Sequence, residues 1–147
     1  MASSIRRGQL ADLPTVSRLL ESVGLPTTDL KSALELQTWV LDAKNSIVGV
    51  IGLEGFGSEA LLRSLAVASE YRKRGLGREL VARLEQDAHA DGIKQLILLT
   101  ETAEPFFRGL GYAVTDRRDV SEDVKQTAEF RSLCPVSAGC MSKSLHT

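Results

Sequence analysis

The sequence predicts an α/β protein with a mixed, mostly antiparallel central sheet and helices on both faces. Short apolar runs that are typical of strands alternate with segments whose apolar residues recur at helical spacing. Three of these runs follow one another with only turns between them, which predicts neighbouring antiparallel strands. The third run leads through a glycine-containing turn into the longest helical segment, which adds a strand–turn–helix unit to the pattern.

Strands are predicted where runs rich in apolar residues end at turn residues. Lys44-Asn45 separates two such runs and predicts a β-hairpin, and residues 55–58 form the next predicted turn. The predicted strands cover residues 4–7, 36–43, 46–53, 61–67, 95–99, 111–114 and 138–145.

Helices are predicted where capping residues precede a helical pattern. A first helix follows Asp12, carries Pro14 in its first turn, and ends at Gly24 and Pro26. Thr102 is a candidate cap for a later short helix. The other predicted helices cover residues 27–33, 77–91, 103–110 and 121–133.

The composition is that of an ordinary soluble globular protein. The 147 residues are expected to form one domain, residues 1–147, and the net charge of −1 supports neither a nucleic acid nor an anionic membrane as partner. No apolar run approaches the length of a membrane span, and the N-terminal residues lack the apolar core of a signal peptide. We therefore expect a cytoplasmic protein, and the sequence leaves open whether it is a monomer or a homodimer.

The cysteines Cys134 and Cys140 fit a reducing compartment. Their C-x5-C spacing is not a usual zinc pattern, and His89 and His146 are not placed to complete one, so no metal site is predicted. We prefer to interpret them as small apolar residues near the last strand. The alternative is a thiol pair that captures a soft metalloid ion.

The turn from Arg72 to Gly77 has the properties of an anion site. It follows a predicted strand and opens a helix, whose first backbone N–H groups lack internal partners and lie at the positive end of the helix dipole. Gly75 and Gly77 allow close approach of an oxyanion to the backbone, and the basic residues of the turn add charge. The spacing is neither that of a Walker loop nor that of the dinucleotide fingerprint, because G-K-[ST] and a third glycine are missing.

Two phrases resemble the GNAT acyltransferase superfamily. R-x-x-G-x-G directly after the L-A-V of residues 65–67 is similar to its coenzyme A pyrophosphate loop. A-x-x-F-F-x-x-x-G-Y, from Ala103 to Tyr112, is similar to its A-x-x-L-Y-x-x-x-G-F. The resemblance implies the GNAT fold and an acetyl-CoA-dependent N-acetyltransferase that uses acetyl-CoA as co-substrate and no metal. The alternative is a basic surface turn that happens to carry two glycines.

The resemblance also implies how acetyl-CoA binds. The pyrophosphate would lie on the backbone and cations of the 72–77 loop, and the pantetheine along residues 65–67 as an added strand. A backbone N–H near Leu65 or Ala66 would polarise the thioester oxygen. The implied cofactor-binding residues are Leu65, Ala66, Val67, Arg72, Lys73, Arg74, Gly75, Leu76, Gly77, Arg78, Thr100, Phe106 and Phe107.

The chain departs from the superfamily pattern at the expected proton donor. Phe107 occupies the position where many members carry a tyrosine that protonates the leaving thiolate, and Thr100 replaces a frequent asparagine. Phenylalanine cannot donate a proton, and Tyr112 is a poor substitute by register. A thiol has a pKa of about 8.5, so we expect solvent to protonate the leaving group.

Arg63 is the most informative residue outside the loop, because a buried arginine needs an anion. Period-two alternation places it on one face with Leu61 and Leu65, the face expected to border the acceptor. Alternatively, a bulge turns it to solvent or to a structural pair with Glu54 or Glu59. Glu54 is a candidate general base, as is a water held by backbone carbonyls.

Longer phrases, among them LLRSLAV and TAEFRSLCPVSA, resemble the arsenic-resistance N-acetyltransferases and, more distantly, N-acetylglutamate synthase catalytic domains. Both imply an α-amino acid acceptor with an acidic side chain, such as glutamate or its arsinic and phosphinic analogues arsinothricin and phosphinothricin. Two substrate anions need two anchors. Arg63 is the first, and Arg118 is the preferred second, ahead of Arg117, Arg131 and Lys143. The predicted acceptor-binding residues are Arg63, Ser64, Arg118, Thr127 and Ser137.

Two other functions stay open at this point. One is a non-catalytic sensor that binds coenzyme A, or arsenite through Cys134 and Cys140. The other is an acetyltransferase for a different amine, such as one of glutamate metabolism or a protein N-terminus.

Overall fold

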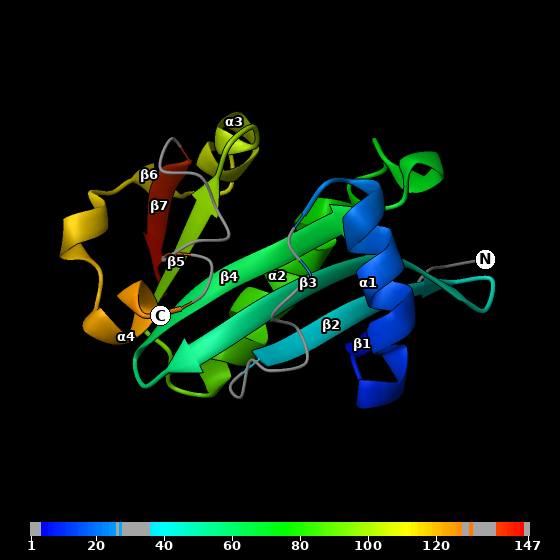
Figure 1. Cartoon of the computed structure of the whole chain (residues 1–147), viewed down its shortest axis with the longest axis horizontal. Coiled ribbons are helices and arrows are strands. Elements are labelled where there is room, and N and C mark those ends of the chain that lie inside the picture. Colours follow the sequence, from blue (N-terminus) through cyan, green and yellow to red (C-terminus); the bar gives the residue numbers. More distant parts are fainter. Residues whose placement is uncertain (1–3, 26, 28–35, 128–129, 131–137, 146–147) are drawn as a thin grey trace.

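The computed structural model describes residues 4–25, 27, 36–127, 130 and 138–145. The strands form a seven-stranded sheet in the order β1-β2-β3-β4-β5-β7-β6, in which only β4 and β5 are parallel (Figure 1). The mixed sheet predicted from the sequence is confirmed. Its strands are β1 (Ser4–Arg7), β2 (Leu36–Ala43), β3 (Ser46–Phe56), β4 (Glu59–Val67), β5 (Gln95–Thr100), β6 (Ala113–Val114) and β7 (Gly139–Ser144).

Two helices cover opposite faces of this sheet (Figure 1). Helix α1 (Leu13–Ser22) packs Val16 and Leu20 against Val40, Val50 and Ala66. Helix α2 (Leu76–Ala90) buries its own apolar stripe against the alternate residues of the same strands. The members of the α2-side core include Trp39, Leu41, Ile51, Leu53, Leu62, Leu80, Leu84, Leu96 and Leu98.

The first hairpin follows from its turn residues. Lys44 and Asn45 adopt φ values of 51° and 65°, the left-handed pair that a two-residue turn between twisted strands requires. The second hairpin is tighter than predicted, because β3 continues to Phe56 and pairs it with Glu59. Gly57, with φ of 72°, makes the turn that residues 55–58 were expected to share.

A bulge in β4 opens the sheet. The pairing of β3 with β4 shifts between Val50–Ala66 and Gly52–Arg63, and Ser64 in the bulge has φ of 61°. On its other side β4 pairs with β5 only over residues 59–61, after which the two strands diverge (Figure 1). Among the described residues, β4 therefore pairs only with β3 from residue 62 onward.

The helices after β5 are shorter than predicted. Helix α3 (Glu104–Arg108) has Ala103 rather than Thr102 at its cap, because Thr100 Oγ1 accepts the Ala103 N–H at 2.9 Å. The helix expected over residues 121–133 is not continuous, since α4 (Glu122–Lys125), capped by Ser121, stops where the chain turns at residues 126–127. Beyond that turn, residues 128–129 and 131–133 of the expected helix lie outside the described residues. The helix expected within residues 27–33 lies outside the described residues, apart from residue 27.

Short 3₁₀ turns complete the chain. They are η1 (Leu10–Asp12), η2 (Ser69–Tyr71) and η3 (Arg117–Asp119). Within the described part of the chain, no helix is long and apolar enough to cross a bilayer.

Candidate active site

The loop before α2 presents unpaired backbone N–H groups. Gly75 caps the helix in the left-handed conformation, with φ of 76°, and the first helical hydrogen bond runs from Glu79 N to Gly75 O. No side chain caps this end. The amides of Leu76, Gly77 and Arg78 therefore face outward at the positive end of the helix dipole. This arrangement suits a diphosphate.

The arginines of the loop shape it as well as charge it. Arg72 donates from Nε to Val67 O at 3.0 Å, and Arg74 donates from Nη2 to Glu70 O at 3.2 Å. The Arg74 guanidinium also lies over the Tyr71 ring, 5.0 Å from its centroid. These contacts hold the cations close to the helix start, where an anion would gain from them.

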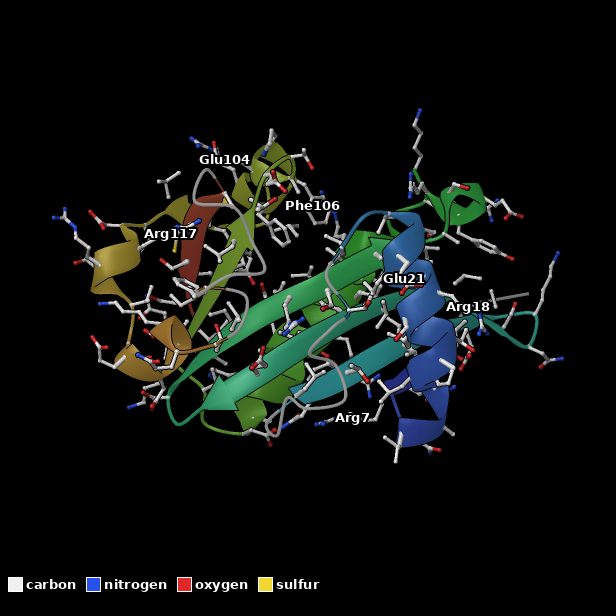
Figure 2. The ribbon with its side chains drawn as sticks, viewed as in Figure 1. Arg7, Arg18, Glu21, Glu104, Phe106 and Arg117 are labelled. Carbon is white, nitrogen blue, oxygen red and sulfur yellow. The ribbon has the colours of Figure 1, made fainter. Side chains whose placement is uncertain are left out.

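Helix α3 contributes an aromatic side chain, Phe106, that lies beside the loop. Phe106 points away from α3 toward the middle of the molecule (Figure 2), and a Cβ added at Gly77 would lie 3.5 Å from Phe106 Cζ. Its ring meets Phe107 edge-on at 5.1 Å between centroids. The structure therefore places Phe106 beside the loop and Phe107 in contact with Phe106, and their binding of the cofactor stays a prediction.

A pocket of about 450 Å³ lies between the diverging strands β4 and β5. It contains six of the predicted cofactor-binding residues, which are Leu65, Ala66, Val67, Arg72, Thr100 and Phe107. It also contains Arg63 and Ser64 of the predicted acceptor site. The lining residues that the sequence did not single out are Val23, Gly24 and Leu25 after α1, Leu62, Leu98, Leu99, Glu101, Thr102, Ala103 and Ala138.

Arg63 forms a buried ion pair. Its Nη1 donates to Glu54 Oε1 at 2.7 Å, and its Nε donates to Ser64 Oγ at 3.1 Å. The side chain of Arg63 has no solvent exposure and that of Glu54 has 8%. The pairing with Glu54 that the sequence left open is therefore present, and Arg63 does not turn to solvent. Its role as an acceptor anchor stays a prediction.

The bulge changes which residues share a face with Arg63. Leu62 and Leu65 both belong to the core on the α2 side, whereas Leu61 packs in a cluster on the opposite face with Ile97 and Val124. The expectation that Leu65 lies on the same face as Arg63 is wrong, because the extra residue at Ser64 reverses the alternation.

The structure does not bring Arg118 or Thr127 to the pocket. Arg118 lies on η3 rather than at the end of a strand, and its exposed side chain pairs with Asp116 at 2.7 Å. This guanidinium lowers the pKa of Asp116 to about 2. Thr127 is buried and donates to Val124 O at 2.8 Å. Ser137, with Arg131 and Cys134, lies outside the described residues.

The described residues that line the pocket include no tyrosine. Phe107 lines the pocket, whereas Tyr112 is buried outside it and donates to Glu85 Oε2 at 2.8 Å. Burial and the neighbouring Glu85 raise the pKa of Tyr112 far above its ordinary value. The described pocket-lining hydroxyls are those of Ser64, Thr100 and Thr102.

Cys140 is buried on β7, and burial raises the pKa of its thiol to about 11. It is therefore a thiol rather than a thiolate at neutral pH, as its interpretation as a packing residue requires. No conclusion about a cysteine pair follows, because Cys134 lies outside the described residues. Among the residues that are described, no cluster of three potential metal-ligating side chains was found.

Known proteins share this sequence pattern and fold. Residues 35–114, more than half of the chain, match the acetyltransferase (GNAT) domain family. An N-acetyltransferase of Chlorobaculum tepidum is 27% identical over 143 residues, which cover 92% of this chain and 90% of that protein. An amino-acid acetyltransferase of Ectopseudomonas mendocina is 45% identical over 51 residues, which cover 35% of this chain and 12% of that protein.

A solved structure shows the same fold over the whole chain. The N-acetylglutamate synthase of Neisseria gonorrhoeae, complexed with coenzyme A and N-acetyl-glutamate, has a TM-score of 0.83 at 18% identity. This chain spans 36% of that protein's length. The family match, the helix-start loop and the pocket between diverging strands lead to one conclusion: the chain belongs to the GNAT acetyltransferase family and is an acetyl-CoA-dependent N-acetyltransferase.

Proposed function

We propose that this enzyme transfers the acetyl group of acetyl-CoA to the α-amine of an α-amino acid with an acidic side chain. The observation that carries the proposal is the 45% identity over 51 residues with an amino-acid acetyltransferase. The acceptors to which the proposal extends are glutamate, arsinothricin and phosphinothricin. The two analogues rest on the sequence phrases that resemble arsenic-resistance acetyltransferases.

In the proposed reaction, residues of the chain would polarise the thioester carbonyl and fix the position of the thioester. The backbone N–H of Leu65 or Ala66 would donate to the thioester oxygen, beyond the point where β4 loses its second strand partner. The 72–77 loop would hold the diphosphate and thereby fix the position of the thioester. Attack by the acceptor nitrogen forms the amide bond and breaks the carbon–sulfur bond, and solvent protonates the thiolate.

Glu54 would take the proton of the acceptor ammonium through a water. Its Oε1 is held by Arg63, and no donor among the described residues reaches Oε2. Glu54 does not line the pocket, so a water must lie between its carboxylate and the amine. Arg63, which does line the pocket, would orient this carboxylate and contribute positive charge near the acceptor's carboxylate.

A panel of amines with a thiol-release readout tests the proposal. L-Glutamate, phosphinothricin and arsinothricin should release coenzyme A, and mass spectrometry should find the acetyl group on their α-nitrogen. L-Glutamine is the matched control, because it has the same shape without the side-chain charge. We expect kcat/KM for glutamate to exceed that for glutamine by roughly tenfold or more, the usual effect of one unpaired buried charge or polar group.

Each other outcome identifies a different function. If all acidic amino acids are refused while a polyamine or a peptide N-terminus is acetylated, the acceptor class is wrong and the acetyltransferase remains. If coenzyme A binds but no amine in the panel releases thiol, the acceptor belongs to none of the amine classes in the panel, and the proposed acceptor class is wrong.

A further inference from the structure

Among the described hydroxyl-bearing residues that line the pocket, Ser64 is the buried one. It has 9% of its surface exposed, whereas Thr100 is half-buried and Thr102 is exposed. A hydroxyl inside a protein needs hydrogen-bond partners, since burial removes the bonds that it would form with water. The partners of the Ser64 hydroxyl therefore indicate what it can do.

The Ser64 hydroxyl accepts one hydrogen bond and keeps its own proton available. Arg63 Nε lies 3.1 Å from Ser64 Oγ, and a guanidinium N–H can only donate, so the serine oxygen is the acceptor. No acceptor for the Ser64 O–H occurs among the described residues. The positive charge of Arg63 polarises the hydroxyl and makes it a stronger donor than an isolated serine. The proton can therefore be donated to a molecule in the pocket.

The bulge in β4 places this hydroxyl next to the backbone that is proposed to polarise the thioester. Two residues of β4, Ser64 and Leu65, lie opposite Ile51 of β3. Ser64 adopts a φ of 61°, which is costly for a residue with a side chain and which glycine would adopt without that cost. Ser64 and Leu65 both line the pocket. The bulge thus sets a side-chain donor beside a backbone donor.

We propose that Ser64 is a catalytic residue, a second hydrogen-bond donor to the thioester oxygen beside the backbone N–H of Leu65 or Ala66. A carbonyl oxygen has two lone pairs and can accept a hydrogen bond from each donor. The inference rests on the proposed function in one respect, that the thioester lies at this part of β4. It does not depend on which amine is accepted.

The two donors act where negative charge develops during the reaction. When the acceptor nitrogen attacks the carbonyl carbon, one electron pair of the C=O bond moves onto oxygen, where the Ser64 O–H and the backbone N–H stabilise it. Ser64 keeps its proton throughout. The pair returns to form the amide carbonyl as the carbon–sulfur bond breaks, and the electrons of that bond leave with sulfur. Because the hydrogen bonds strengthen in the transition state, they raise kcat more than they tighten substrate binding.

Ser64→Ala and Ser64→Gly test the proposal kinetically. Both variants lose the hydroxyl, so kcat should fall by about 10²-fold or more, while both Michaelis constants stay within about twofold of the parent. Alanine keeps the backbone strain at this position and glycine relieves it. Similar losses of kcat in the two variants would therefore assign the effect to the hydroxyl rather than to the backbone.

Ser142→Ala is the matched control. Ser142 is a partly buried serine of β7 that does not line the pocket, and its hydroxyl pairs with that of Thr115. Its kinetic constants should equal those of the parent.

Other roles of the Ser64 hydroxyl predict a different division between the kinetic constants. If Ser64 contacted the acceptor, or acted only by holding Arg63 in place, KM for the acceptor would rise and kcat would hold. All constants are measured with the best acceptor of the amine panel, so refusal of glutamate overturns only the proposed acceptor.

A second readout needs no acceptor. Acetyl-CoA labelled with carbon-13 at the thioester carbonyl gives an infrared band that isotope-difference spectra separate from the protein bands. A hydrogen bond to the oxygen weakens the C=O bond, so the band of bound acetyl-CoA should move to higher frequency in Ser64→Ala and Ser64→Gly and stay in place in Ser142→Ala. This measurement decides even if every amine of the panel is refused.

The proposal is overturned if the carbonyl band does not move in the Ser64 variants. It is equally overturned if kcat stays within about threefold of the parent in both variants, or if only KM for the acceptor changes. If Ser64→Ala does not fold, Ser64→Gly decides by the same measurements, because glycine fits the left-handed φ.

Discussion

Arg63 and Glu54 show how a single bulged residue creates a charged site inside an apolar sheet. Both side chains are buried, and their 2.7 Å contact joins neighbouring strands β3 and β4. Ser64 adopts a left-handed φ of 61°, a conformation that costs a non-glycine residue free energy and that is often retained at functional sites. The strain places a hydroxyl beside the guanidinium, with 3.1 Å between Ser64 Oγ and Arg63 Nε.

Replacing Glu54 should mainly lower kcat, whereas replacing Arg63 should mainly raise KM for the acceptor. Glu54→Gln keeps the shape of the acceptor of the Arg63 hydrogen bond, and kcat should fall by about 10²-fold or more if Glu54 directs proton removal. Arg63→Ala should raise KM for the acidic acceptor by roughly 30-fold, because loss of a buried anchor costs about 2–5 kcal/mol. KM for acetyl-CoA should hold in both variants. A kcat within about threefold of the parent in Glu54→Gln would remove Glu54 from the mechanism.

Urea unfolding of the same variants provides the stability control. Arg63→Ala leaves a buried carboxylate without its partner, and the free energy of unfolding should fall by about 3–5 kcal/mol. Replacing both residues, as in Arg63→Met with Glu54→Leu, should recover most of that loss because no buried charge remains. Recovery of stability without recovery of activity would assign the pair to function rather than to folding.

At the scale of the elements, the sequence could predict what local chemistry determines. The Lys44-Asn45 hairpin and the glycine turn at residues 72–77 could be predicted because turn residues and glycines determine the backbone conformation of their immediate neighbours. The bulge at Ser64 could be raised only as an alternative for Arg63, because nothing in the run of residues 61–67 distinguishes a regular strand from one with an added residue. The helix expected over 121–133 failed since apolar spacing does not show that the chain turns at residues 126–127.

The residues of the candidate site also fall into two groups, those that a sequence motif could identify and those that it could not. Residues of the cofactor loop and of β4 are consecutive in the chain, so a motif could identify them. Val23 to Leu25 and Ala138 join the pocket from distant segments, and only the tertiary fold brings them there. Arg118 shows the opposite error, because a basic residue near the right strand points to solvent once its turn is formed.

The network of Tyr112, Glu85 and Lys143 links α2 to β7 and gives a pH prediction. Tyr112 donates to Glu85 Oε2, and Lys143 Nζ lies 3.0 Å from Glu85 Oε1. Burial and Glu85 raise the pKa of Tyr112, so the folded protein retains a proton that the unfolded chain releases above about pH 10. Its contribution to stability is therefore complete below that pH and declines as the pH rises further.

Tyr112→Phe tests this network and the proton-donor assignment together. We expect kcat to remain within a few-fold of the parent, since Tyr112 does not line the pocket. In urea unfolding between pH 9 and pH 11, the parent should lose about 1.4 kcal/mol more per pH unit above the tyrosine pKa than the variant does. A fall in kcat of about 10²-fold would instead identify Tyr112 as the general acid.

At the scale of the whole molecule, the divergence of β4 from β5 organises the function. The sheet is continuous below residue 61, and above it the two strands separate around a pocket of about 450 Å³. Helix α2 presents its N-terminal amides at the edge of this opening, through a loop whose Arg72 lines the pocket. Such a function requires above all that an anion, the diphosphate of acetyl-CoA, binds at the start of α2.

Calorimetric titration of acetyl-CoA into the parent, Gly77→Asn and Gly77→Asp tests that claim most directly. A Cβ at Gly77 meets only Phe106, at distances of 3.5 Å or more, and Gly77 does not have a positive φ, so a Cβ at this position is in ordinary van der Waals contact and brings no backbone strain. They have the same shape and differ in charge. Gly77→Asp should weaken binding at least tenfold more than Gly77→Asn, because a carboxylate beside the diphosphate costs upward of about 1.4 kcal/mol. Equal affinities of the two folded variants would show that the diphosphate does not bind at this loop.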